Sequence, residues 1–333
     1  MMKHETGRSR WGIWAAGLMA MALSGCAVEE AELADEEGAA SEAEEARVSG
    51  PAFVYLRVRQ DYRRCVSPLC GGVFVSRVNY RTMRCADGVY RGECYVGTVD
   101  ATALSEEAQE WSRSSAAILR GRIEPFVTEG FGNLGRLVLT EAWRPGAPDR
   151  TSELTPELVR DNGRRCVRAP CFSLDAVRLN RGVNNPVSGL TLEGLGADRD
   201  TLAQARANLA RDASGVIVAG HRAPRGEAVT LVPEQFWVRV GEGVRDEQFC
   251  NSDDECTRPQ YGTLVTRAAD CACPSLCPVW ALNVTAATEN QRSFQRYCRN
   301  TLASCPVARC ARPPEVACIR HACGTALLDG SSR

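Results

Sequence analysis

Cysteine is the residue type whose number and spacing could do most chemistry in this chain, which has 17 cysteines among 333 residues. A thiolate can act as a nucleophile or bind a metal, but an even set of cysteines at this density in a secreted chain indicates disulfides. Setting Cys26 apart leaves sixteen cysteines, enough for eight disulfides. We therefore expect an oxidising compartment and no thiol catalyst.

Cys26 has a different setting from the other cysteines. It ends the tetrapeptide Leu23-Ser24-Gly25-Cys26, which follows a basic start and the apolar run 12–23. A basic start, a short apolar run and small residues are typical of a secretory signal, and this run is shorter than the roughly 20 residues that span a bilayer. The tetrapeptide resembles the lipobox of bacterial lipoproteins, which implies a signal peptide over 1–25 and a lipid-anchored Cys26. The alternative is an ordinary signal peptide.

An acidic segment follows Cys26. Residues 27–46 carry nine carboxylates and no basic residue, so we predict a disordered tether over 26–50. The lipoprotein resemblance and Ala27 favour the outer membrane over the inner one, with the body outside the cytoplasm. The chain beyond residue 46 has 37 arginines and 31 carboxylates. These arginines are dispersed and lack interleaved aromatic residues, which argues against nucleic-acid binding.

The body contains one pattern twice, at an offset of 101 residues. Arg63-Arg64-Cys65-Val66, Cys70 and Arg77-Val78-Asn79 match Arg164-Arg165-Cys166-Val167, Cys171 and Arg178-Leu179-Asn180. Both copies alternate short apolar runs with one amphipathic stretch, which predicts strands, a helix and further strands. We therefore expect an α+β fold with two tandem units, 51–148 and 152–245, each made of a small antiparallel sheet and one helix.

Some details of the two units can be predicted. Ser105 would begin a helix that buries Trp111, Ile118 and Leu119, and Asp200 would begin the second helix. Pro156 should make the first strand of the second unit weaker or place it at a sheet edge.

Repeat symmetry also predicts disulfides. The second unit has two cysteines only, so pairing within each unit joins Cys166 to Cys171 and, by symmetry, Cys65 to Cys70. Cys85 then remains for Cys94. Bonds between the units are the alternative, and they would leave an odd count somewhere.

The two motif blocks resemble an uncharacterised extracellular domain family of GC-rich, myxobacteria-like bacteria. The resemblance covers 51–148 and, more loosely, 152–245. It implies no activity. The second unit has no counterpart of Cys85 and Cys94.

Residues 248–325 should form a small disulfide-rich domain with a helix near 285–299. Its ten cysteines, with no pairing predicted, are Cys250, Cys256, Cys271, Cys273, Cys277, Cys298, Cys305, Cys310, Cys318 and Cys323. Cys271, Cys273 and Cys277 could bind a metal, but they lack the paired C-x2-C spacing. The acidic run 251–255 lacks the spacing of a calcium loop, so we expect a turn there.

Catalytic patterns are missing around the two histidines beyond the signal, His221 and His321. We therefore expect a non-catalytic binding or structural surface module with no metal or cofactor and with an unknown protein or glycan ligand. One alternative is a protease inhibitor acting through the Cys-rich tail. Another is a hydrolase whose carboxylate site is assembled only in space.

Overall fold

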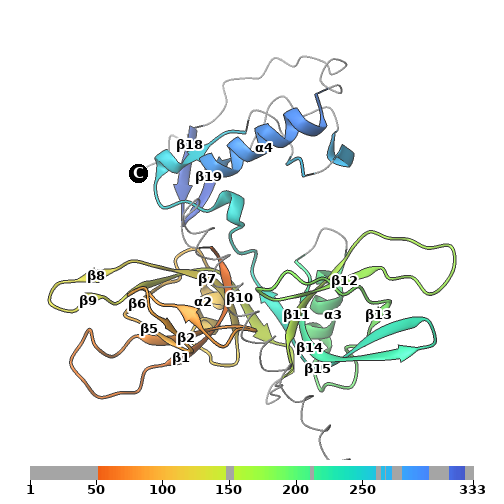
Figure 1. Cartoon of the computed structure of the whole chain (residues 1–333), viewed down its shortest axis with the longest axis horizontal. Coiled ribbons are helices and arrows are strands. Elements are labelled where there is room, and N and C mark those ends of the chain that lie inside the picture. Colours follow the sequence, from red (N-terminus) through yellow and green to blue (C-terminus); the bar gives the residue numbers. More distant parts are fainter. Residues whose placement is uncertain are drawn as a thin grey trace, which may run out of the picture.

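The structure, a computed structural model, describes residues 52–147, 154–210, 214–259, 264–266, 268–271, 280–299 and 315–326. A wide β-structure made of two halves carries a smaller C-terminal tail, which contains the helix α4 (Val284–Tyr297) (Figure 1). Among the described residues, no helix is long and apolar enough to cross a membrane.

The first half covers 54–145 and contains one short helix. Its elements are β1 (Val54–Gln60), β2 (Val73–Arg77), β3 (Met83–Arg84), β4 (Tyr90–Arg91), β5 (Cys94–Val96), β6 (Thr98–Asp100), α2 (Glu106–Trp111), β7 (Ile118–Glu124), β8 (Val127–Thr128), β9 (Gly132–Asn133) and β10 (Arg136–Pro145).

The second half covers 156–240 and follows a similar order. Its elements are β11 (Pro156–Asp161), β12 (Leu174–Arg178), β13 (Gly189–Leu190), α3 (Arg199–Asn208), β14 (Val216–Arg225) and β15 (Ala228–Val240). Its described residues, 154–210 and 214–240, include no counterparts of the β3–β4 and β8–β9 hairpins.

The two halves share one 11-stranded sheet with the strand order β12-β11-β14-β15-β10-β7-β1-β2-β5. Its pairs are antiparallel, except that β6 and β13 run parallel to β10 and β15. The predicted α+β fold with two separate units is therefore wrong. The described residues are mostly β. They form one large sheet, because β10 and β15 pair with each other instead of ending two small sheets.

The centre of the sheet is nearly symmetric. Glu141-Ala142-Trp143 in β10 aligns with Gln235-Phe236-Trp237 in β15. In this alignment Arg144 corresponds to Val238, and the same two residues are paired between the antiparallel strands. From this pair outwards, the order β10-β7-β1-β2 matches β15-β14-β11-β12. A pseudo-twofold axis therefore passes through the Arg144–Val238 pair.

The outer strands of the two halves also meet, through the two asparagines of the repeated pattern. Both have left-handed backbones, with φ of 65° at Asn79 and 62° at Asn180. The Asn180 amide donates to the carbonyls of Tyr55 and Val78, each at 2.8 Å, and its oxygen accepts the Tyr55 N–H at 2.8 Å.

Asn79 makes the matching contacts in the other direction. Its amide donates to the carbonyls of Pro156 at 2.9 Å and Leu179 at 3.0 Å. The third bond is missing because Pro156 has no N–H. Of the two alternatives predicted for the strand of Pro156, an edge position is excluded, since Pro156 begins β11, which pairs on both sides with β12 and β14. The first position of a strand tolerates proline.

Between these contacts lies a buried apolar cluster drawn from both halves. It contains Val78, Ile118, Trp143, Leu158, Leu179, Ile217, Ala219 and Trp237. The Trp237 indole N–H donates across the junction to the carbonyl of Ala116 at 2.8 Å. The halves therefore share a core as well as a sheet.

The helices begin close to the predicted positions but end differently. Ser105 caps α2 by accepting from Ala108 N–H, as expected. The helix stops at Trp111, however, and Ile118 and Leu119 belong to β7, where they are buried in the sheet. The second helix is capped by Asp198, not by Asp200.

The tail combines short elements with disulfides. It contains three 3-10 turns (Asp246–Gln248, Asp253–Glu255 and Ala268–Asp270), β16 (Cys256–Thr257), β17 (Leu282–Asn283), α4, β18 (Glu315–Ile319) and β19 (Ala322–Ala326). Disulfides join Cys250 to Cys318, Cys256 to Cys323 and Cys271 to Cys298. The first two connect the start of the tail to its final hairpin.

Candidate functional site

The loop between β1 and β2 is held rigidly at the outer end of the first half. The Cys65–Cys70 disulfide closes it, and Arg63 binds the Asp61 carboxylate at 2.9 Å and the Leu69 carbonyl at 2.9 Å. The hydrogen bonds from Arg63 lower the pKa of Asp61 to about 2. Three large hydrophobic side chains are exposed on this loop: Tyr62, Val66 and Leu69.

Beneath this loop lie two aromatic rings of the sheet. Phe74 and Tyr95 meet edge to face at 5.6 Å between ring centroids. The guanidinium of Arg63 lies over both rings, 4.9 Å from the Phe74 centroid and 5.0 Å from the Tyr95 centroid. The Tyr95 hydroxyl donates to the Pro68 carbonyl at 2.8 Å. The loop is therefore fixed to the sheet.

The β3–β4 hairpin lies next to these rings. The Cys85–Cys94 disulfide ties it to β5, and Asp87 accepts from Val89 N–H at 3.0 Å and from Arg91 at 2.7 Å. These bonds lower the pKa of Asp87. Val89 and Tyr90 are exposed on this hairpin.

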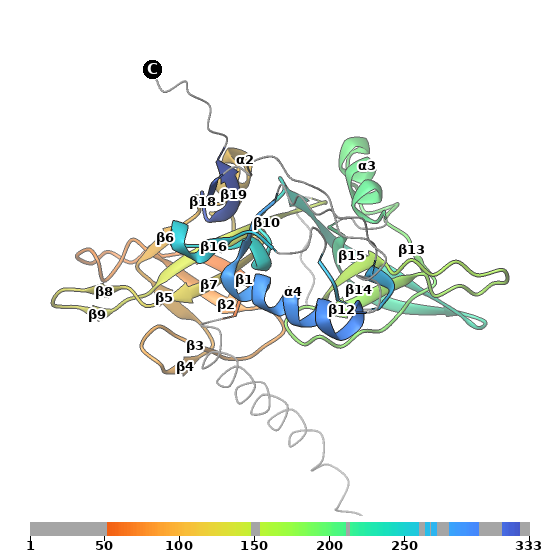
Figure 2. The same ribbon diagram turned by 90° about the horizontal axis from the view of Figure 1, so that it is seen from above.

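The β8–β9 hairpin completes the group and projects away from the second half (Figure 2). The Asn133 side-chain oxygen accepts from Phe126 N–H at 2.8 Å, and its amide donates to the Ala86 carbonyl of the β3–β4 hairpin at 2.7 Å. Phe126, Val127 and Phe131 remain exposed.

These three loops concentrate exposed apolar side chains at one end of the molecule. Eight of the thirteen exposed large hydrophobic residues in the described chain lie on them. A cavity of about 320 Å³ opens between the loops, lined by Phe74, Tyr95, Asn133 and the β3–β4 hairpin. Clustered exposed hydrophobic residues on a soluble domain mark a contact surface. We call this group the first-half loop surface.

The carboxylates of this surface are held in ion pairs. Asp61, Asp87 and Glu93 each pair with an arginine, at 2.9, 2.7 and 2.7 Å. The hydrogen bonds that Asp61 and Asp87 accept lower the pKa of both carboxyl groups, so both are charged at neutral pH.

The opposite end of the sheet is plainer. The Cys166–Cys171 disulfide closes the loop between β11 and β12, and Arg165 pairs with Asp161 at 2.7 Å. Where the structure describes this half, its exposed large hydrophobic residues are Val167 and Val183.

A family model matches residues 54–243, from the first residue of β1 to just beyond β15. It is described as a domain of unknown function, DUF6748. The chain belongs to the DUF6748 family. The matched stretch includes both halves of the shared sheet. No curated protein and no solved structure matches the chain.

Within the DUF6748 domain, the structure pairs the cysteines as the sequence predicted: Cys65 with Cys70, Cys85 with Cys94, and Cys166 with Cys171. Cys26 lies outside the described residues. So do Cys273, Cys277, Cys305 and Cys310 of the tail.

The tail residues considered for metal binding have other contacts. Cys271 is bonded to Cys298. The sulfurs of Cys250, Cys256 and Cys318 lie within 4.8 Å of one another, but all three cysteines are in disulfides. In the acidic run, Asp253 accepts from Cys318 N–H and Glu255 from Asn251 N–H, both at 2.8 Å. These carboxylates therefore support the local backbone.

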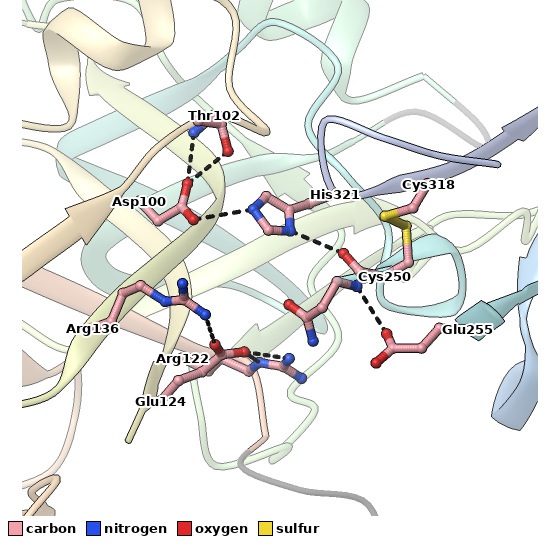
Figure 3. A network of polar contacts seen from close by, with 10 residues as sticks. Asp100, Thr102, Arg122, Glu124, Arg136, Cys250, Glu255, Cys318 and His321 are labelled. Carbon is pink, nitrogen blue, oxygen red and sulfur yellow. Dashed lines mark hydrogen bonds and ion pairs between the residues drawn. A yellow bond between two sulfur atoms is a disulfide. The ribbon is translucent and has the colours of Figure 1, made fainter. Parts of the chain in front are cut away.

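The two histidines lie in different settings. His221 is exposed in β14 of the DUF6748 domain. His321, on the tail, contacts Asp100 at the end of β6 (Figure 3). Sequence reasoning missed this contact because Asp100 and His321 are 221 residues apart.

Proposed function

We propose that the protein is a lipid-anchored, extracytoplasmic and non-catalytic binding module that contacts its partner through the first-half loop surface. The observation that carries the proposal is the concentration of eight exposed large hydrophobic residues on three braced loops. Rigid loops lose little conformational entropy on binding, so exposed apolar side chains on them contribute efficiently to affinity.

The compartment follows from the covalent structure. Six disulfides within the described residues indicate an oxidising, extracytoplasmic environment. The lipobox-like Leu23-Ser24-Gly25-Cys26 supports a lipid anchor at Cys26, and the acidic stretch 27–46 supports a spacer between the membrane and the DUF6748 domain. Ala27 favours the outer membrane.

An internal duplication accounts for the likeness of the two halves, and the extra hairpins account for their difference. The matching strand orders and the reciprocal asparagine contacts support two copies of one ancestral unit. In the part of the chain that the structure describes, only the first copy carries the β3–β4 and β8–β9 hairpins. These two hairpins supply five of the eight exposed large hydrophobic residues. The first copy thus presents the contact surface, and the second copy supports it.

The partner that fits best is a protein. Exposed aliphatic side chains such as Val66, Leu69 and Val127 suit an apolar protein surface, and aromatic residues are enriched where proteins meet. A glycan is the alternative ligand, because exposed aromatic rings are also present on this surface at Tyr62, Tyr90 and Phe131.

The binding proposal is tested by paired substitutions at the two ends. Val127→Ser with Phe131→Ser should reduce partner capture from the producing cells at least tenfold and leave the melting temperature within about 2 °C, because both side chains are exposed. Val167→Ser with Val183→Ser is the matched control. Equal loss from both pairs would reject the first-half loop surface as the contact.

The anchor has a separate test. Mass spectrometry of the mature protein should show an acylated N-terminal Cys26, and Cys26→Ser should release the protein from membranes. An unmodified Cys26 would refute the lipoprotein assignment without affecting the binding proposal.

A further inference from the structure

The tail contacts the DUF6748 domain through the turn between β18 and β19. Arg320 and His321 form this turn, both with left-handed backbones (φ 49° and 62°). The turn directs the His321 ring between two segments. Nε2 lies 3.1 Å from the Asp100 carboxylate, and Nδ1 lies 2.9 Å from the carbonyl of Cys250 (Figure 3).

Both neighbours of the His321 ring can only accept hydrogen bonds, because one is a carboxylate and the other a backbone carbonyl. A neutral imidazole has one N–H, so it satisfies one neighbour and turns a lone pair towards the other. The imidazolium has two N–H groups and satisfies both. The imidazolium can therefore make one more hydrogen bond at this place than the neutral ring can.

The contact is shielded enough for this choice to matter. The side chains of His321 and Asp100 are only 16% and 17% exposed. The ring also stacks on Phe249, with 5.3 Å between centroids and 2° between planes. Phe249 in turn packs against Phe53 at 4.8 Å and belongs to an apolar cluster with Val138, Val244, Ala103 and Ala322. The histidine therefore lies beside the apolar contact that joins the tail to the sheet.

The other charged groups nearby are paired among themselves. Arg122 lies 4.4 Å from the Phe249 centroid and binds Glu124, which also binds Arg136. Arg120 binds Asp246 at the start of the tail. Arg320, next to His321 in the turn, is exposed. Asp100 is thus the carboxylate that responds directly to the charge on His321.

Asp100 stays ionised well into the acid range. Burial acts to raise its pKa, but the hydrogen bonds from Thr102 and the contact with His321 outweigh burial and hold the pKa below its ordinary value. Thr102 donates from both its backbone N–H, at 3.2 Å, and its hydroxyl, at 2.6 Å.

We propose that His321 is a pH-dependent latch that holds the Cys-rich tail on the DUF6748 domain when protonated and loosens it when neutral. The apolar cluster around Phe249 keeps the tail in place in both states, so the latch changes how often the contact opens. The tail is joined to β15 by a short stretch of chain, so opening exposes the end of β6 without separating the two parts.

The direction of the pH effect follows from the two groups. The ion pair needs a charged His321 and a charged Asp100. The lowered pKa of Asp100 keeps this carboxylate charged in mildly acidic solution, and histidine side chains in general change charge between about pH 5 and 8. The latch should be closed at about pH 5.5 and weakened at about pH 8.

The test is hydrogen exchange by mass spectrometry on the full mature chain with its disulfides intact, corrected for the intrinsic pH dependence of exchange. Peptides covering Asp100 and Phe249 should show about tenfold more frequent opening at about pH 8 than at about pH 5.5, the size expected for losing one hydrogen bond between charged groups. His321→Gln should remove this pH dependence. His221→Gln, which changes the exposed histidine, should behave like the unmodified chain.

Asp100→Asn provides a second, independent variant. It should open as often at about pH 5.5 as the unmodified chain does at about pH 8, because the imidazolium loses its charged partner. Equal opening of the unmodified chain at both pH values, or a pH dependence that survives in His321→Gln, would overturn the latch.

Discussion

Asn79 and Asn180 show how a short sequence pattern can hold a whole sheet together. Each asparagine lies in the turn that follows a strand and has a left-handed backbone, which asparagine tolerates better than most residues with a side chain. This conformation lets the side-chain amide reach backbone groups of the opposite half. The Arg-[Val/Leu]-Asn part of the repeated motif is therefore structural, whereas its Arg-Arg-Cys-Val part lies exposed at the outer loops.

The two asparagines should differ in their contribution to stability. Asn180→Ala removes three hydrogen bonds and Asn79→Ala removes two, because Pro156 offers no N–H. Each backbone group left buried without a partner costs about 1–3 kcal/mol. We expect Asn180→Ala to lower the free energy of unfolding by about 1 kcal/mol more than Asn79→Ala, as measured by urea denaturation.

Glycine variants at the same positions separate hydrogen bonding from backbone strain. Glycine accepts a positive φ at no steric cost, so Asn180→Gly and Asn79→Gly should keep the same difference. If that difference disappears in the glycine pair, the extra bond to Tyr55 contributes nothing and the reciprocal contact has been misread.

At the scale of elements, the disulfides fall into two classes. Those of the DUF6748 domain close loops between residues five or nine apart, whereas Cys256–Cys323 and Cys250–Cys318 span 67 and 68 residues. In the chain-entropy model, closing a longer loop restricts the unfolded chain more. The short bridges therefore shape loops, and the long ones hold the tail together.

Removing the bridges of each class should show this difference. Replacing Cys250, Cys256, Cys318 and Cys323 with serine removes both long bridges and should destabilise the tail by more than about 4 kcal/mol, whereas serine at Cys65 and Cys70 should cost the DUF6748 domain about 2 kcal/mol. Peptide-resolved hydrogen exchange in increasing urea measures both. The Cys166–Cys171 bridge has the same span as Cys65–Cys70, so its loss is the internal control. A larger cost at the short bridges would contradict the classification.

The individual strands, caps and short disulfides of this chain could be predicted from the sequence better than the pairing of its strands. The sequence places several strands, the Ser105 cap and the three disulfides of the DUF6748 domain correctly, because each depends on near neighbours in the chain. The end of α2 was missed because Ile118 and Leu119 fit a helical stripe equally well, and only their burial in β7 distinguishes the two structures.

At the scale of the whole molecule, the missing information was the pairing of β10 with β15. Nothing in either apolar run shows whether it closes its own small sheet or joins the other copy. The joined arrangement covers an edge of each half and buries both Trp143 and Trp237 at the junction. The candidate surface was equally hidden, since its loops come from three separate stretches that only the folded sheet brings together.

In this architecture, one part of the molecule stabilises the sheet and another part presents the proposed contact surface. The pseudo-twofold core fixes the sheet, the hairpins found only in the first half extend one end of it, and the tail docks near β6 and β7. The central claim is that the end bearing the first-half loop surface, and not its plainer counterpart, meets the partner.

The most direct measurement is site-specific photo-crosslinking in the producing cells. A benzophenone side chain would replace Val66, Val127 or Phe131 in the first half, and Val167 or Val183 in the second, all of them exposed. The three first-half positions should crosslink to one common partner, and the two second-half positions should not. Crosslinks to that partner from the second half alone, or equally from both ends, would contradict it.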